Sequence, residues 1–405
     1  MSISSAMQTG ISGLYTNGEA MSVIGNNIAN ANTIGFKEGR TLFADMLSTT
    51  INQGQVGRGA QIQAVQNMYS QGSFENTGSA TDLAIQGSAM FVLADPTGVG
   101  QFYSRAGAFT FNKEQILTNA DGYQVQGYGI RNDASNGVLG PINLTNFANM
   151  ASKPTSNVTL TANFDATQAP PAAVWDPTLA NFNPNLASNF SGSSTVYDAQ
   201  GNAKSLTMYF CNTGADSWEV YTYDGTTYTP AGGGTPVSFN ANGSLASVNG
   251  VAGGTTFSAN GQTIDLAGST QYAGSSTVFA QAQDGYASGT LTNVTVDNQG
   301  YVNGMYTNGQ EQKLAQVALA SFASTGGLEK LGGSLFGATA QSGSALIGTA
   351  NSGSNKILSN SLEQSNVDMA DQLVQLITTQ RAYTANSKTI TSADQMMQDT
   401  LTLIR

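Results

Sequence analysis

The last segment of the chain, residues 365–405, reads SNVDMADQLVQLITTQRAYTANSKTITSADQMMQDTLTLIR, and its spacing decides the fold. Apolar side chains recur at strict intervals of seven: Met369, Leu376, Tyr383, Ile390, Met397 and Ile404. A period of seven places these side chains on one stripe of an α-helix. Ser365 and Asp368 fit a capping box, so we expect the helix to begin near Asn366. The companion position, which starts at Leu373, is mostly polar, so we expect a narrow seam that faces a neighbouring assembly.

The N-terminal segment repeats this pattern. Its stripe consists of Met7, Leu14, Met21 and Ile28, seven apart, with Ile11 and Ile24 beside them. Four glycines lie in the same stretch, at Gly10, Gly13, Gly18 and Gly25. Each costs a helix about 1 kcal/mol relative to Ala, so this helix must be held by packing, and its glycines allow another backbone to approach closely. One alternative is an amphipathic helix that lies on a globular body. A stripe at both termini favours a terminal helix pair that packs against other subunits.

The middle of the chain has the pattern of β-structure. Ser217 to Tyr223 alternates with period two, and Asp224-Gly225 predicts a hairpin turn before Tyr228. A second hairpin is expected from Val196-Tyr197, through the turn at 198–202, to residues 206–210. A cluster of prolines predicts a domain junction near 145–155 and a long surface loop over 169–190.

These patterns predict a mainly β chain with α-helical termini. We expect discontinuous, nested β domains and a coiled-coil-like helical core domain built from both ends. The expected parts are a helical inner core (1–32 and 363–405), extended connecting segments (33–70 and 345–362), a β domain (71–145 and 285–344) and an outer β insert (146–284). Residues 145–284 carry two basic and eight acidic side chains, so we expect this insert to be the most solvent-exposed domain.

Composition excludes several classes of function. The chain has 405 residues, a net charge of −11 and only 10% charged residues, which disfavours binding to nucleic acid. It contains no histidine, which removes His-dependent catalytic and metal sites, and its single cysteine, Cys211, cannot form an intrachain disulfide. No apolar run reaches the roughly 18 residues of a membrane-spanning helix. The first basic residue is Lys37, so a cleaved secretory signal is not expected.

No catalytic motif is recognisable. Phosphate-binding, nucleophile-elbow and calcium-loop patterns are absent from the sequence, while a pair of carboxylates suited to glycoside hydrolysis stays open. Cys211 lies in an alternating run and is interpreted as a small buried strand residue. We therefore expect a protein that is not an enzyme and that needs no cofactor or metal.

Short motifs near both ends resemble the bacterial flagellar rod and hook family. The N-terminal signature is NNIANANTIGFK at 26–37, preceded by Ser12-Gly13-Leu14, and the C-terminal motif is LEQSNVD at 362–368, followed by QRAY at 380–383 and NSK at 386–388. Internal blocks TDLAIQG at 81–87 and SRAGAF at 104–109 are also similar to the family. Residues 87–91 depart from it, because the family usually has a second glycine and two aromatics there. The matching motif positions are Asn26, Asn27, Asn30, Thr33, Gly35, Phe36, Ser365, Asn366 and Asp368.

Two further blocks resemble the hook members of this family. They are STVYDAQGN at 194–202, similar to the outer domain, and the segment from Gly304 through Gln310 to Phe322. Distal rod proteins are shorter and lack a large insert. The resemblance implies a subunit that is exported unfolded by the flagellar export apparatus, without a cleaved signal, and that assembles outside the cell into the hook.

The resemblance also implies the function. Hook subunits polymerise beneath a cap into a curved tube, a universal joint that transmits motor torque from rod to filament. The implied partners are further copies of the chain, the hook cap, the distal rod and the hook–filament junction proteins, with no nucleic acid and no membrane insertion. Two alternatives stay open: a distal rod protein of the same family, or a secreted β-rich adhesin or enzyme.

Overall fold

The computed structural model describes residues 3–46, 50–51, 54–55, 57–98, 100–131, 134–350 and 355–403. The chain forms two compact units that are both discontinuous in sequence. The first unit contains residues 1–147, 292–305 and 311–405, and the second contains residues 148–291 and 306–310. The fold is mainly β with one long helix near each end, as the sequence predicts.

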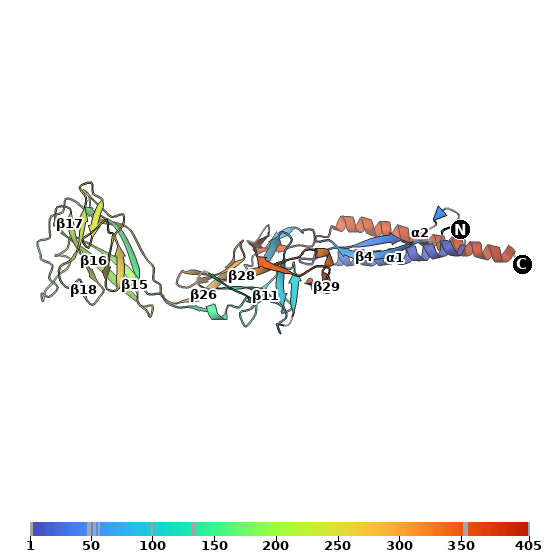
Figure 1. Cartoon of the computed structure of the whole chain (residues 1–405), viewed down its shortest axis with the longest axis horizontal. Coiled ribbons are helices and arrows are strands. Elements are labelled where there is room, and N and C mark those ends of the chain that lie inside the picture. Colours follow the sequence, from blue (N-terminus) through green and yellow to red (C-terminus); the bar gives the residue numbers. More distant parts are fainter. Residues whose placement is uncertain are drawn as a thin grey trace. The chain divides into compact units, whose positions relative to one another are not determined.

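The two helices of the first unit lie side by side and run antiparallel (Figure 1). They are α1 (Ile3–Ala29) and α2 (Met369–Leu403). A Cβ added at Gly10 would lie 2.9 Å from Ile390 Cγ1, and one added at Gly13 would lie 2.5 Å from the Asn386 amide. These two glycines therefore permit the close approach expected of them, and the backbone that approaches belongs to α2 of the same chain.

Helix α2 begins three residues later than the capping box predicts. Asp368 caps it, since its Oδ1 accepts hydrogen bonds from the backbone N–H groups of Ala370 (2.8 Å) and Asp371 (3.3 Å). The proposed start near Asn366 is wrong because the Asn366 side chain bonds to residues of another segment and keeps the chain extended there. Ser365 instead accepts from the backbone N–H of Val367.

A two-stranded ribbon, β1 (Gly39–Asp45) with β4 (Ala60–Asn67), packs beside α1. The ribbon is antiparallel and has a β-bulge between Leu42 and Phe43. A short pair, β2 (Thr50–Ile51) with β3 (Gly54–Gln55), lies within the connection between β1 and β4.

The β body of the first unit is one large sheet with short satellite pairs. Its main path runs β27-β28-β11-β7-β8-β30-β29, and β12 and β31 add to β11 and β28. The bounds are β7 (Met90–Ala94), β8 (Gln101–Ser104), β11 (Gln124–Arg131), β12 (Ala134–Pro141), β27 (Tyr301–Tyr306), β28 (Glu311–Ser321), β29 (Glu329–Gly332), β30 (Leu335–Gly337) and β31 (Leu346–Thr349). β10 (Leu117–Thr118) joins the large sheet through β11 and pairs with β9 (Thr110–Phe111). The satellites are β5 (Phe74–Asn76) with β33 (Ser361–Glu363) and β6 (Leu83–Gln86) with β32 (Lys356–Ser359). Strands from early and late sequence pair directly, so the chain leaves this body and returns to it.

The second unit encloses a core between two sheets. One sheet contains β15 (Phe190–Tyr197), β16 (Ala203–Gly214), β17 (Ser217–Tyr223), β18 (Tyr228–Thr229), β19 (Thr235–Phe239), β20 (Leu245–Val248) and β21 (Val251–Ala252). The other contains β14 (Asn157–Asp165), β22 (Thr256–Ala259), β23 (Gln262–Asp265), β24 (Thr270–Tyr272) and β25 (Thr277–Gln283). Phe164 from one sheet and Phe210, Trp218 and Phe239 from the other meet in the buried core.

Both predicted hairpins are confirmed within this unit. Strands β17 and β18 pair across the turn at Asp224-Gly225, where Asp224 accepts from the N–H groups of Thr226 and Thr227. Strands β15 and β16 pair across residues 198–202. Cys211 is a buried residue of β16, as predicted, and its Sγ lies 3.0 Å from the Ala187 carbonyl oxygen. The connection between β14 and β15 covers it, with Trp175 stacked on Tyr221 at 4.2 Å between ring centroids.

Candidate functional site at the junction of the two chain ends

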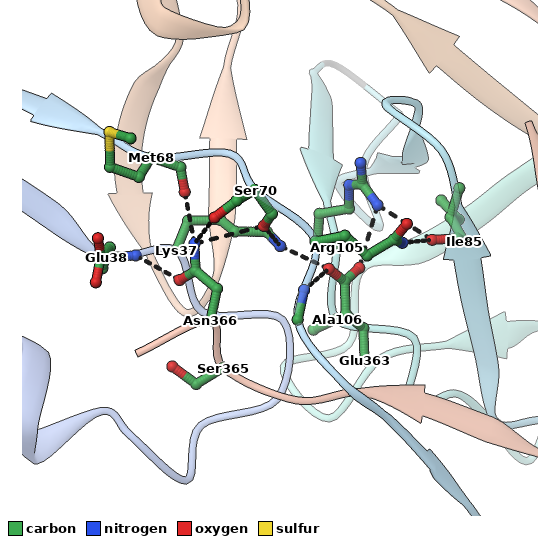
Figure 2. Close-up of polar contacts among 12 residues, drawn as sticks. Lys37, Glu38, Met68, Ser70, Ile85, Arg105, Ala106, Glu363, Ser365 and Asn366 are labelled. Atoms are coloured by element: carbon green, nitrogen blue, oxygen red, sulfur yellow. Dashed lines mark hydrogen bonds and ion pairs between the residues drawn. The ribbon is translucent and has the colours of Figure 1, made fainter. Parts of the chain in front are cut away.

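A buried charge cluster joins the two ends of the chain where the helices meet the β body (Figure 2). Glu363, at the end of β33, accepts from Lys37 Nζ at 2.6 Å and from Arg105 Nη1 at 3.1 Å. The side chains of Lys37 and Glu363 are fully buried, and that of Arg105 is 2% exposed. Lys37 is separated from Glu363 by 326 positions in sequence, so the contact fixes the outgoing segment against the returning one.

Backbone groups complete this cluster. Lys37 also donates to the Ser70 carbonyl (2.7 Å), while Arg105 donates to the carbonyls of Ile85 and Gly87. Two cations share the single carboxylate of Glu363, so these backbone carbonyl oxygens accept the hydrogen bonds that the carboxylate cannot. Burial lowers the pKa of both Lys37 and Arg105, and the Glu363 carboxylate opposes that shift. Because removal of one partner leaves an unpaired buried charge, such a cluster holds one arrangement of its segments firmly.

Asn366 connects three segments beside the cluster (Figure 2). Its Oδ1 accepts from the N–H of Glu38 at 2.8 Å, and its Nδ2 donates to the carbonyl of Met68 at 2.8 Å and to Ser70 Oγ at 2.9 Å. The residue therefore crosslinks the start of the β1–β4 ribbon, the end of that ribbon and the entry to α2.

Asn27 makes the equivalent connection from α1. Its Nδ2 donates to the Gly39 carbonyl (2.8 Å) and to Gln372 Oε1 (3.0 Å), and its Oδ1 accepts from the Gly39 N–H. Asn27 and Gln372 are both buried, so these polar groups bind the two helices and the ribbon together.

The remaining N-terminal motif residues shape the exit from α1. Asn30 donates to the Asn26 carbonyl and accepts from Thr33 Oγ1, which closes the last turn. Gly35 has φ +67, and a Cβ there would lie 2.5 Å from the backbone nitrogen of Ala106, so only glycine fits. Its N–H donates to the Glu363 carbonyl. Phe36 lies under Lys330 Nζ at 4.8 Å.

The helix residues predicted to pack between subunits are not fully buried within the chain. Ile11, Met369, Leu373, Tyr383 and Met397 are exposed, and the half-buried ones are Met7, Leu14, Met21, Ile28, Leu376 and Ile390. Ile404 lies outside the described residues. Part of the predicted stripe is used within the chain, since Ile24 is buried and Ile390 lies against Gly10. The exposed stripe residues remain available, and their role between subunits stays a prediction.

Sequence reasoning missed Lys37, Arg105 and Glu363 as site residues, although all three lie in the motif blocks. One signal was available: in a chain with 10% charged residues, each charge inside a motif is unusual. Among the described residues, no group of three or more Cys, Asp or Glu side chains is placed to hold a metal ion. No described helix is long and apolar enough to cross a membrane.

Comparison with known proteins shows that the chain is similar to flagellar rod and hook proteins. Family models match along the chain: flagella basal body rod protein (7–37), the flagellar hook protein FlgE/F/G D1 domain (84–163), the flagellar basal body protein FlaE D2 domain (163–286) and the flagellar basal body rod FlgEFG protein C-terminal region (358–403). Both halves of the junction, around Lys37 and around Glu363, fall in matched segments.

Relatives that match over nearly the whole chain are flagellar hook proteins. The flagellar hook protein FlgE of Salmonella typhimurium is 36% identical, over 97% of this chain and 98% of the relative, and that of Escherichia coli is 36% identical over 98% and 100%. FlgE of Borreliella burgdorferi is 34% identical over 98% and 99%. The Helicobacter pylori hook protein FlgE2 structure aligns with 70% of this chain and 98% of its own, at 13% identity and a TM-score of 0.49. This chain belongs to the flagellar hook protein family.

Proposed function

We propose that this chain is the structural subunit of the flagellar hook, which assembles through its terminal helices into a curved tube that transmits torque from rod to filament. One observation carries the proposal: although α1 and α2 pack closely at Gly10 and Gly13, large apolar side chains such as Tyr15 and Leu373 stay exposed along both helices. Contacts that repeat without closing build an open helical tube. The nested domain division given above belongs to the same proposal, as do export by the flagellar apparatus and contacts with the hook cap, the distal rod and the hook–filament junction proteins.

The junction gives the subunit a means of carrying load. Force on the helices reaches the β body through the segments around Lys37 and Glu363, which the buried charge cluster and Asn366 hold together. A rotating bent tube must also let neighbouring subunits slide. Only 10% of the residues are charged, which limits the ion pairs that neighbouring subunits could form, and the buried pairs Lys37–Glu363 and Arg105–Glu363 lie within one subunit. Short uncharged surface side chains can then slide past a neighbour at low cost.

A matched pair of variants tests this proposal. Leu373 on α2 is 46% exposed and Val251 on β21 is 59% exposed, so an Asp at either place is tolerated by the free subunit. In a packed helix layer an unpaired charge costs several kcal/mol. We expect Leu373→Asp to abolish tube formation, seen by electron microscopy of purified chain, and Val251→Asp to leave it unchanged. Curved tubes from Leu373→Asp at the unmodified yield would contradict assembly through the helices.

A further inference from the structure

An open, largely apolar groove lies between α1 and the β4 side of the β1–β4 ribbon. Its volume is 760 Å³, and Ile11, Tyr15 and Val23 of α1 face Met46, Ile62 and Val65 of the ribbon segment across it. Ile11 and Tyr15 are more than half exposed, and Val65 is half exposed. Exposed apolar surface of this kind, rimmed by polar side chains, marks an interaction site.

Two charged side chains line this groove at different places. Arg58 lies near Ser12, because the Ala60 N–H donates to Ser12 Oγ at 3.3 Å, whereas Glu19 lies about two helical turns further along α1. The ion pairs between described residues include neither Arg58 nor Glu19. An apolar segment that places a carboxylate beside Arg58 would therefore match this end of the groove in both polarity and charge.

The C-terminal part of α2 has these properties. Ala393 is buried against α1 and only 2% exposed, whereas Met397 and Leu401, next along the same face, are 40% and 68% exposed. Asp394 precedes Met397 by three positions and Leu401 by seven, so all three side chains share one face of the helix. No α2 residue is among the described residues that line the groove of the same chain.

We propose that residues 394–401 of α2 in one subunit occupy the α1–ribbon groove of a second copy. Met397 and Leu401 pack against Ile11, Tyr15 and Val65, and Asp394 pairs with Arg58. Groove and helix end are different surfaces of one chain, so the contact is heterologous and repeats from subunit to subunit without closing. This inference rests on the proposed self-assembly and names the surfaces that join.

Disulfide crosslinking tests the contact directly in the full chain. Ile62→Cys and Leu401→Cys in one chain should give a ladder of covalent oligomers when the polymer is oxidised. Copolymers of the two single variants should give dimers only, because each chain then offers one half of the contact. Leu401→Cys with Val251→Cys is the matched control and should give no ladder. The native Cys211 is buried and contributes no background.

Charge reversal tests the polar part. Arg58→Asp and Asp394→Arg should each lower polymer yield at least tenfold at low salt, and the double variant should restore most of it. A double variant no better than the singles overturns the Arg58–Asp394 pair. Polymer that forms normally but shows no 62–401 crosslink overturns the groove assignment and leaves self-assembly intact. Failure of the unmodified chain to polymerise would instead overturn the proposed function.

Discussion

The terminal helices and the second unit differ in the core that each can form within one chain. The second unit places its largest side chains, Phe164, Phe210 and Trp218 among them, inside a core between two sheets. Helices α1 and α2 leave Tyr15 and Leu373 exposed, at 67% and 46%. The second unit therefore has a core of its own, whereas we expect the helical ends to complete their burial against other chains.

The buried cluster gives the largest expected effect. Glu363→Ala leaves Lys37 and Arg105 buried without an anion, so the first unit should lose about 3–5 kcal/mol of unfolding free energy. The second unit should be unaffected. Both tryptophans, Trp175 and Trp218, lie in the second unit, so their fluorescence reports its unfolding in a denaturant titration. Helical circular dichroism reports the unfolding of the first unit.

A surface ion pair in the second unit supplies the matched control for Glu363→Ala. Lys153→Ala removes the Lys153–Asp284 pair, in which the lysine side chain is 49% exposed and the separation is 3.6 Å. Such a pair contributes at most about 1 kcal/mol. Equal losses from Glu363→Ala and Lys153→Ala would show that the buried cluster is no stronger than a surface pair.

Deletion of most of the second unit tests whether assembly and tube curvature depend on different parts of the chain. Met150 and Gly289 are directly paired across an antiparallel ladder, so an Asn-Gly turn can replace residues 151–288. Because both helices and the junction remain, we expect the shortened chain to polymerise, with tubes that lose stable curvature. Electron microscopy of the polymer measures both properties. A shortened chain that cannot fold or polymerise would show that the insert belongs to the assembly core.

The smallest effect is expected at Cys211. Burial raises the pKa of this thiol to about 12, so at pH 8 only about one thiol in ten thousand is ionised. Because the thiolate is the reactive form, labelling by a maleimide should be at least about 100-fold slower in native protein than in denaturant. Rapid labelling of native protein would mean that the connection containing Trp175 opens readily and that the second unit does not keep Cys211 buried.

The sequence predicts the helices because their signal is local. Strict sevenfold spacing marks both helical ends, and the turns at 224–225 and 198–202 carry their own residue preferences. The start of α2 was misplaced because Asn366 is engaged by a ribbon that is distant in sequence. Gly10 and Gly13 indicated a close backbone approach, but nothing local shows that the approaching helix is α2 of the same chain.

The contacts of the buried charge cluster and its neighbours could not be predicted from the sequence. Asn27, Gly35 and Asn366 were found through their motifs, but which groups they bind depends on tertiary contacts. Lys37 meets Glu363 across 326 positions, and no periodicity encodes such a pairing. The surplus cation is balanced by backbone carbonyls, which every residue has, so composition alone does not point to them.

Amide hydrogen exchange on dilute monomer and on polymer tests the central claim most directly. Helices that lack burial open locally at low cost, whereas strands of a closed core open only with the whole unit. We predict weak protection over Leu376 to Met397 in the monomer, strong protection there in the polymer, and equal protection of β16 and β17 in both. Strong protection of Leu376 to Met397 in the monomer would show that the helices are complete within one chain and would contradict the account.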